Sequence, residues 1–73
     1  MSTKENCVTF DGKVTELMRG GVYRVLIEGQ DHLVLARLNG KMRMHRIKVL
    51  LGDTVEVEMS PYDLSQGRIT RRR

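Results

Sequence analysis

Five short segments of this chain alternate apolar and polar residues with the two-residue period of half-buried strands. They span residues 8–15, 23–28, 32–38, 54–59 and 68–72, and turn-forming residues separate them. With only 73 residues available, this pattern predicts one all-β domain whose strands share a single small core. The residues expected to face that core are Val8, Phe10, Gly12, Val14, Tyr23, Val25, Ile27, Val34, Ala36, Leu38, Val55, Val57 and Met59.

Glycine and proline mark where the strands bend and end. Gly12 lies inside the first strand and predicts a bulge or sharp bend, as a strand in a small barrel requires. The pair Gly20-Gly21 predicts a tight turn with positive φ. Pro61 cannot donate to a sheet ladder, so a loop is expected over residues 61–67. The last segment, 68–72, has few apolar residues and is expected at a sheet edge or at the seam that closes a barrel.

A short helix is expected between the third and fourth strands. Asn39-Gly40 ends the third strand, and the apolar residues Met42, Met44 and Ile47 then fit neither period well. The two methionines are expected in the core or as helix cover. Three strands, a short helix and two more strands are typical of the five-stranded Greek-key OB-fold barrel, which binds oligonucleotides through its second and third strands and adjoining loops. An SH3-like barrel is the alternative, but it would usually lack the helix.

The cations are concentrated in the second half of the chain. Residues 1–36 hold four cations and five acids, whereas residues 37–73 hold nine cations and four acids. Five of these cations and His45 lie between Arg37 and Lys48, where there is no carboxylate, and the chain ends in three arginines. A cluster of one sign indicates an anionic partner. If the fold brings the middle cluster and the C-terminal arginines together, they form one electropositive face.

Other classes of protein lack the necessary residues. One cysteine cannot form an internal disulfide, and Cys7, His32 and His45 cannot complete a four-ligand zinc site. No catalytic constellation or phosphate-binding glycine loop is present, so no enzymatic activity and no cofactor are expected. No segment resembles a signal peptide or approaches the roughly 18 apolar residues of a membrane span. We therefore expect a soluble cytoplasmic protein, monomeric when free, with a flexible tail over residues 1–6 and one domain over residues 7–73.

Motifs along nearly the whole chain resemble those of bacterial translation initiation factor 1. They are Gly12-Lys13-Val14, Tyr23-Arg24-Val25, Asn39-Gly40-Lys41-Met42-Arg43, the stretch from Ile47 to Asp53, and the stretch Ser60-Pro61-Tyr62-Asp63-Leu64-Ser65-Gln66-Gly67-Arg68-Ile69. The pairing of Gly-Lys-Met-Arg with Tyr-Asp-Leu-Ser-x-Gly-Arg-Ile at this spacing is specific. The resemblance implies an OB-fold RNA-binding protein that occupies the decoding (aminoacyl-tRNA) site of the small ribosomal subunit.

The resemblance also implies partners and site residues. The partners would be ribosomal RNA, the ribosomal protein that lines the decoding site, and the other two initiation factors, with elongator tRNA excluded. The RNA-contacting positions of the family fall on Lys41, Arg43, Lys48 and Arg68, with support from Arg72. Lys48 stands where the family usually has arginine, and Arg46 where it often has an aromatic residue. The full set of expected RNA-binding residues is Lys41, Arg43, His45, Arg46, Lys48, Tyr62, Arg68 and Arg72.

Two other functions are compatible with a basic OB barrel. A cold-shock-type RNA chaperone would stack bases on surface aromatics. This chain has three aromatic residues, of which Phe10 and Tyr23 are expected in the core and only Tyr62 remains. A protein-interaction barrel would use the basic face against an acidic protein, and the fold alone does not exclude it.

Overall fold

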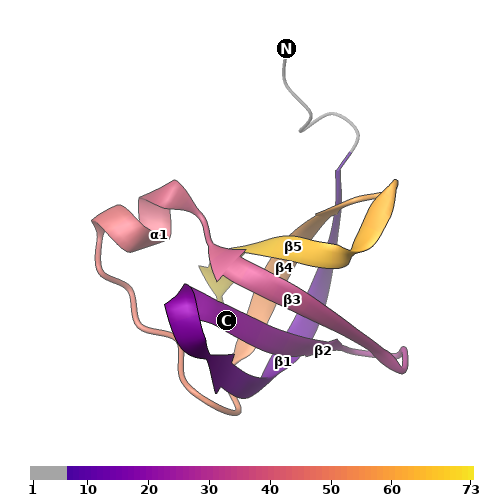
Figure 1. Ribbon diagram of the computed structural model, residues 1–73, viewed down its shortest axis with the longest axis horizontal. Coiled ribbons are helices and arrows are strands. Elements are labelled where there is room, and N and C mark those ends of the chain that lie inside the picture. The colour runs from indigo at the N-terminus through magenta and orange to yellow at the C-terminus, as the bar shows by residue number, and fades with distance from the viewer. Residues whose placement is uncertain (1–6) are drawn as a thin grey trace.

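The protein is a closed five-stranded barrel with one short helix, described here from a computed structural model over residues 7–73 (Figure 1). The predicted tail, residues 1–6, lies outside the described residues. In chain order the elements are β1 (Val8–Met18), the 3-10 turn η2 (Arg19–Gly21), β2 (Val22–Ile27), β3 (His32–Leu38), α1 (Gly40–Met44), β4 (Thr54–Ser60) and β5 (Asp63–Arg72). The prediction of an OB-fold barrel with a helix between its third and fourth strands is confirmed.

The strand order around the barrel is β1-β2-β3-β5-β4, and β4 returns to pair with β1. The first three strands form an antiparallel meander. The connection through α1 then carries the chain across the barrel, so that β5 inserts between β3 and β4, parallel to β3 and antiparallel to β4. The segment predicted as an edge or a seam is therefore the seam.

The core consists mostly of residues that alternation placed inside, with Ile69, Met42 and Val49 in addition. The almost fully buried strand residues are Val14 of β1, Val25 and Ile27 of β2, Val34 and Ala36 of β3, Val55, Val57 and Met59 of β4, and Ile69 of β5. Met42 of α1 and Val49 of the following connection, each 3% exposed, cover one end of the barrel. Phe10, Tyr23 and Leu38 are partly buried against this core. Val8 was expected to face the core, but it is exposed at the start of β1, so that prediction was wrong.

Gly12 is required by a close approach of two strands. It pairs with Ile27 of β2 and with Val55 of β4, at the point where β1 changes from one partner to the other. A Cβ atom at this position would lie 2.5 Å from Cγ1 of Val25 and 2.9 Å from the Leu26 carbonyl oxygen. The shift in register lies instead between Val14 and Glu16, so the predicted irregularity is real but is centred near Thr15.

Two further local predictions were wrong. The loop expected over residues 61–67 is limited to a turn at Pro61-Tyr62, and β5 already begins at Asp63. This stretch is a strand because its backbone pairs with β3 and β4 on both sides, although its side chains are mostly exposed. Met44 was expected to pack, yet it is 76% exposed, because only Met42 of this five-residue helix faces the barrel.

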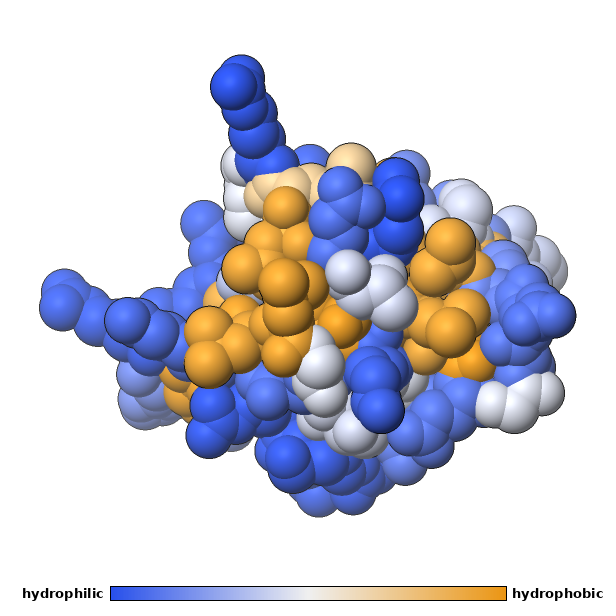
Figure 2. All heavy atoms as spheres, turned by 90° about the horizontal axis from the view of Figure 1, so that it is seen from below, coloured by the Kyte–Doolittle hydropathy of each residue, from blue (hydrophilic) through white to orange (hydrophobic). Residues whose placement is uncertain are grey.

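Exposed leucines cover much of the outer surface of the meander. Leu33 and Leu35 of β3 are 50% and 41% exposed and so face outward. Leu26 is paired with Leu33 across β2 and β3. Figure 2 shows that apolar side chains on the face seen there form two groups with polar residues between them. None of the described helices is long and apolar enough to cross a membrane.

Candidate nucleic-acid interface

Four of the cations expected to bind RNA meet at the end of the barrel that α1 covers, namely Arg43, Arg46, Lys48 and Arg72. Asn39 caps the helix, since its side-chain oxygen accepts a hydrogen bond from the Met42 N–H at 2.8 Å. Met42 is buried, which leaves Arg43 exposed on the same short helix. Arg43, Arg46 and Lys48 line one depression, whose walls also include Tyr23, Leu38, Met42, Ile47, Val49 and Leu50.

Arg37 connects this depression to the side of the barrel. It lines a second, neighbouring depression together with Arg43 and the Gly20-Gly21 turn. Arg37 also lies beside Arg68, its register partner on the parallel strand β5. Arg37 was not among the expected RNA-binding residues, although alternation over residues 32–38 places its side chain outward.

Arg72 reaches the same end of the barrel from the C-terminal strand. A shift in register at Thr70 places Arg71 opposite Glu56 and Arg72 opposite the buried Val55. From there the Arg72 guanidinium donates a hydrogen bond to the backbone carbonyl of Lys48 at 3.0 Å. This bond fixes the C-terminal strand to the connection that carries Arg46 and Lys48. We call Arg37, Arg43, Arg46, Lys48 and Arg72 the helix-end cluster.

Within residues 7–73, no carboxylate neutralises the helix-end cluster. No acid lines either depression, and the ion pairs of the described residues involve only the cations Arg24, Arg71 and Arg73. Arg37 and Arg68 are like charges on paired strands, which disfavours their contact, but two acids, Glu58 and Asp63, line the same depression as Arg68. Arg68 also pairs in register with Glu58 on β4, but no ion pair joins the two among the described residues.

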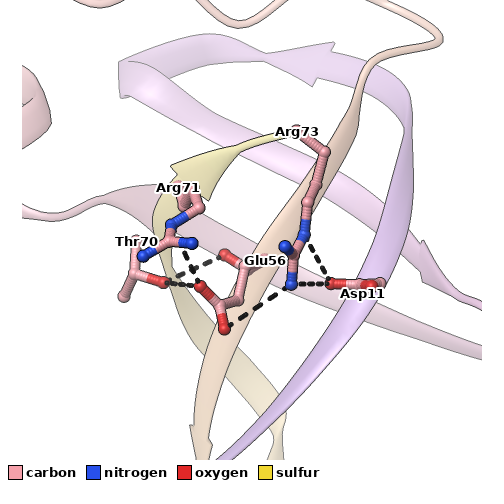
Figure 3. A network of polar contacts seen from close by, with 5 residues as sticks. All are labelled: Asp11, Glu56, Thr70, Arg71 and Arg73. Atoms are coloured by element: carbon pink, nitrogen blue, oxygen red, sulfur yellow. Dashed lines mark hydrogen bonds and ion pairs between the residues drawn. The ribbon is translucent and has the colours of Figure 1, made fainter.

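The other two C-terminal arginines lie elsewhere and are paired with acids (Figure 3). Arg73 lies 3.0 Å from Asp11 and 3.8 Å from Glu56, and Arg71 lies 3.8 Å from Glu56. We call Asp11, Glu56, Thr70, Arg71 and Arg73 the C-terminal network. The expected single electropositive face therefore includes Arg72 and excludes Arg71 and Arg73, because the bulge at Thr70 directs these neighbours to different surfaces.

The remaining expected residues are exposed but are not all close to the cluster. Lys41 of α1 and His45 at its C-cap lie beside Arg43 in the chain and line neither depression. Tyr62 belongs to the turn between β4 and β5, at the other side of the barrel from α1 in Figure 1, and is 88% exposed. Over residues 7–73, no group of three His, Cys, Asp or Glu residues is arranged to hold a metal ion.

The chain forms a closed Greek-key barrel, and one end of that barrel carries the helix-end cluster. It is therefore a small OB-fold protein with a surface suited to polyanions. Within that class the family is specific. The family model of translation initiation factor 1A / IF-1 matches residues 1–73, and the chain belongs to this family. These factors are non-enzymatic, as was predicted.

One solved structure supports this assignment, and others share the fold. The solution structure of translation initiation factor 1 from the Wolbachia endosymbiont strain TRS of Brugia malayi is 35% identical, with a TM-score of 0.79 over 96% of this chain and 82% of that one. YjeQ from Thermotoga maritima is 26% identical, with a TM-score of 0.73 over 90% of this chain and 23% of that chain. Translation initiation factor 5A from Methanococcus jannaschii shares the fold, at 16% identity and a TM-score of 0.66 over 92% of this chain and 44% of that one.

Proposed function

We propose that this initiation factor binds the small ribosomal subunit at its decoding site, with ribosomal RNA docked on the helix-end cluster and on Lys41 and Arg68. In that position it blocks elongator tRNA and assists the other two initiation factors in the cytoplasm. The ribosomal protein that lines the decoding site is a further expected contact, and the free protein is expected to be a monomer. The observation that carries the proposal is a group of exposed cations that no acid within residues 7–73 neutralises.

The charge of this surface is suited to RNA phosphates. Each cation that contacts a phosphate releases a condensed counterion, so affinity falls as salt rises. With roughly 5 to 8 such contacts, the logarithm of the affinity should fall by about 0.7–0.9 per contact for each unit of log salt. Lys48 supplies one of these charges as a compact ammonium, without the planar fork that an arginine would present.

Folded RNA is a better ligand for this surface than an unstructured strand. Binding of single strands depends on aromatic side chains that stack with bases, at about 1–3 kcal/mol per base. Here the outward residues of β2 and β3 include Leu26, Leu33 and Leu35, while Phe10 and Tyr23 pack against the core. Tyr62 is exposed, but a single aromatic residue in the β4–β5 turn offers a stacking surface for few bases. These placements favour docking by charge and shape over a cold-shock-type activity.

Co-sedimentation across a salt series tests the proposal. The purified protein is mixed separately with small and large subunits and pelleted, and its affinity for an unstructured oligonucleotide is measured at matched salt by fluorescence anisotropy. We expect pelleting with small subunits, lost steeply as salt rises, and much weaker binding to the other two ligands. Equal affinity for the oligonucleotide would support the chaperone, whereas no association with either subunit would support a protein-interaction barrel. Either result would overturn the proposal.

A further inference from the structure

Arg46 has a backbone conformation that the rest of the described chain reserves for glycine. Its φ is 55°, in the left-handed region, where a Cβ atom crowds the following carbonyl oxygen. The other residues with positive φ between residues 7 and 73 are Gly20, Gly21, Gly29 and Gly52. Arg46 is therefore the one described residue with a side chain that carries this strain.

The hydrogen bonds that end α1 account for the conformation at position 46. The Ile47 N–H donates to the Met42 carbonyl at 3.0 Å, and the Arg46 N–H donates to the Arg43 carbonyl at 3.2 Å. This pair of bonds is the Schellman motif, in which the residue after the helix C-cap is left-handed and is usually glycine. The reversal is needed because Met42 and Val49, on either side of it, both return to the barrel end and are buried.

The Arg46 side chain makes no stabilising polar contact within residues 7–73. It is exposed, and no ion pair or side-chain hydrogen bond to another described residue involves it. It lines the depression at the helix end together with Arg43 and Lys48. A glycine would remove the strain, and it would also remove the central one of these three cations along the chain.

We propose that Arg46 lowers the stability of the free protein and raises its affinity for RNA. Its guanidinium binds an RNA phosphate between those held by Arg43 and Lys48. This interaction offsets the backbone strain only in the complex. The inference rests on the proposed function for its ligand. It adds that the residue at position 46 limits the stability of the free protein. Strained residues retained at binding surfaces commonly have such a role.

Three substitutions at this position separate the strain from the charge. Arg46→Gly removes both, Arg46→Ala removes the charge and keeps a Cβ, and Arg46→Lys keeps both. In thermal unfolding without RNA, we expect the midpoint temperature of Arg46→Gly to lie roughly 2–6 °C above that of the wild type. Arg46→Ala and Arg46→Lys should unfold close to the wild-type temperature. In small-subunit binding, Arg46→Gly and Arg46→Ala should each weaken affinity about 10-fold at low salt, and Arg46→Lys much less.

The two measurements fail in different ways. If Arg46→Gly is no more stable than Arg46→Ala, the strain is absent and the inference is wrong. If Arg46→Gly binds the small subunit as tightly as the wild type, and with the same salt slope, the side chain does not contact RNA and the inference is again wrong. A wild-type protein that does not bind subunits at all would overturn the proposed function itself, which the unfolding measurement does not depend on.

Discussion

The protein holds two arginine-rich regions that differ in how their charge is treated. In the C-terminal network, Arg71 and Arg73 lie within 4 Å of Asp11 or Glu56 on the neighbouring strands. In the helix-end cluster, Arg43, Arg46 and Lys48 surround one depression with no acid among its lining residues. The first region is neutralised within the protein and fastens the chain end to the barrel, whereas the second is left for an external anion.

One backbone irregularity creates this difference. Arg71, Arg72 and Arg73 are adjacent in sequence, and strict alternation would place Arg71 on the same face as Ile69. The bulge at Thr70 brings Arg71 opposite Glu56 and turns Arg72 toward Lys48. The contrast teaches that a basic run in a sequence does not define a basic surface, because strand register decides which cations meet acids.

The largest expected effect comes from removing charge from the helix-end cluster, compared with the same change in the C-terminal network. Arg43→Ala combined with Lys48→Ala should weaken small-subunit binding by about 2–4 kcal/mol at low salt, because two phosphate contacts are lost. The matched double variant Arg71→Ala with Arg73→Ala should lose less than about 1 kcal/mol of affinity, since those charges are already paired. Equilibrium binding to purified small subunits measures both.

Unfolding curves serve as the control for this comparison. The helix-end double variant should unfold close to the wild type, because both side chains are exposed and neither forms an ion pair with an acid of residues 7–73. If the two double variants lose equal affinity while remaining folded, the distinction between the two regions disappears.

An intermediate effect is expected from loosening the helix that holds one region together. Asn39→Ala removes the bond to the Met42 N–H and should lower the free energy of unfolding by about 1 kcal/mol. Asn39→Asp keeps an acceptor and serves as the matched control for the cap. Denaturant titration measures the loss, and an Asn39→Ala variant as stable as the wild type would show that the cap does not support α1.

A smaller effect is expected from releasing the paired arginines. Glu56→Gln removes the carboxylate shared by Arg71 and Arg73, while Asp11 still holds Arg73. Stability should fall by less than about 1 kcal/mol, because these are pairs near solvent. The salt slope of small-subunit binding should stay as in the wild type, since Arg71 lines neither depression of the helix-end cluster. A steeper slope would show that Arg71 reaches phosphate and would contradict the separation of the two regions.

The smallest effect concerns a carboxylate outside both regions. Two hydrogen bonds from Ser65 lower the pKa of Asp63 below its ordinary value of 3.8. The bond from the Ser65 hydroxyl contributes more than the bond from its N–H. A lowered folded pKa means that any contribution to stability is present above the ordinary pKa and is lost as pH falls through the folded one. Ser65→Ala should raise the pKa of Asp63 toward 3.8, with no effect on RNA binding. An NMR titration of the Asp63 carboxyl checks this, and an unchanged pKa in the variant would contradict it.

Much of the barrel could be predicted from the sequence because alternation and core burial coincide in β2, β3 and β4. The first half of β5 was missed because its side chains are mostly exposed, so residues such as Ser65 and Gln66 show no apolar pattern. Only its backbone pairing with β3 and β4 makes this stretch a strand. Met44 was misassigned because a five-residue helix buries a single position, and periodicity cannot choose between two methionines.

The candidate site was predicted in part, for similar reasons. The one-sign run identified Arg43, Arg46 and Lys48, which do meet. Arg37 was omitted because its importance depends on its parallel neighbour Arg68, which no local pattern shows. The separation of Arg72 from Arg71 follows from a bulge at a threonine, a residue that strands ordinarily favour. The strain at Arg46 is invisible in the sequence because the expected signal would have been a glycine.

A structure of the complex with the small ribosomal subunit is the most direct test of the central claim. The account predicts RNA phosphates within hydrogen-bond distance of Arg43, Arg46 and Lys48, while Arg71 and Arg73 still contact Glu56 and Asp11. Phosphates bound by Arg71 and Arg73, with the helix-end cluster facing solvent, would contradict it.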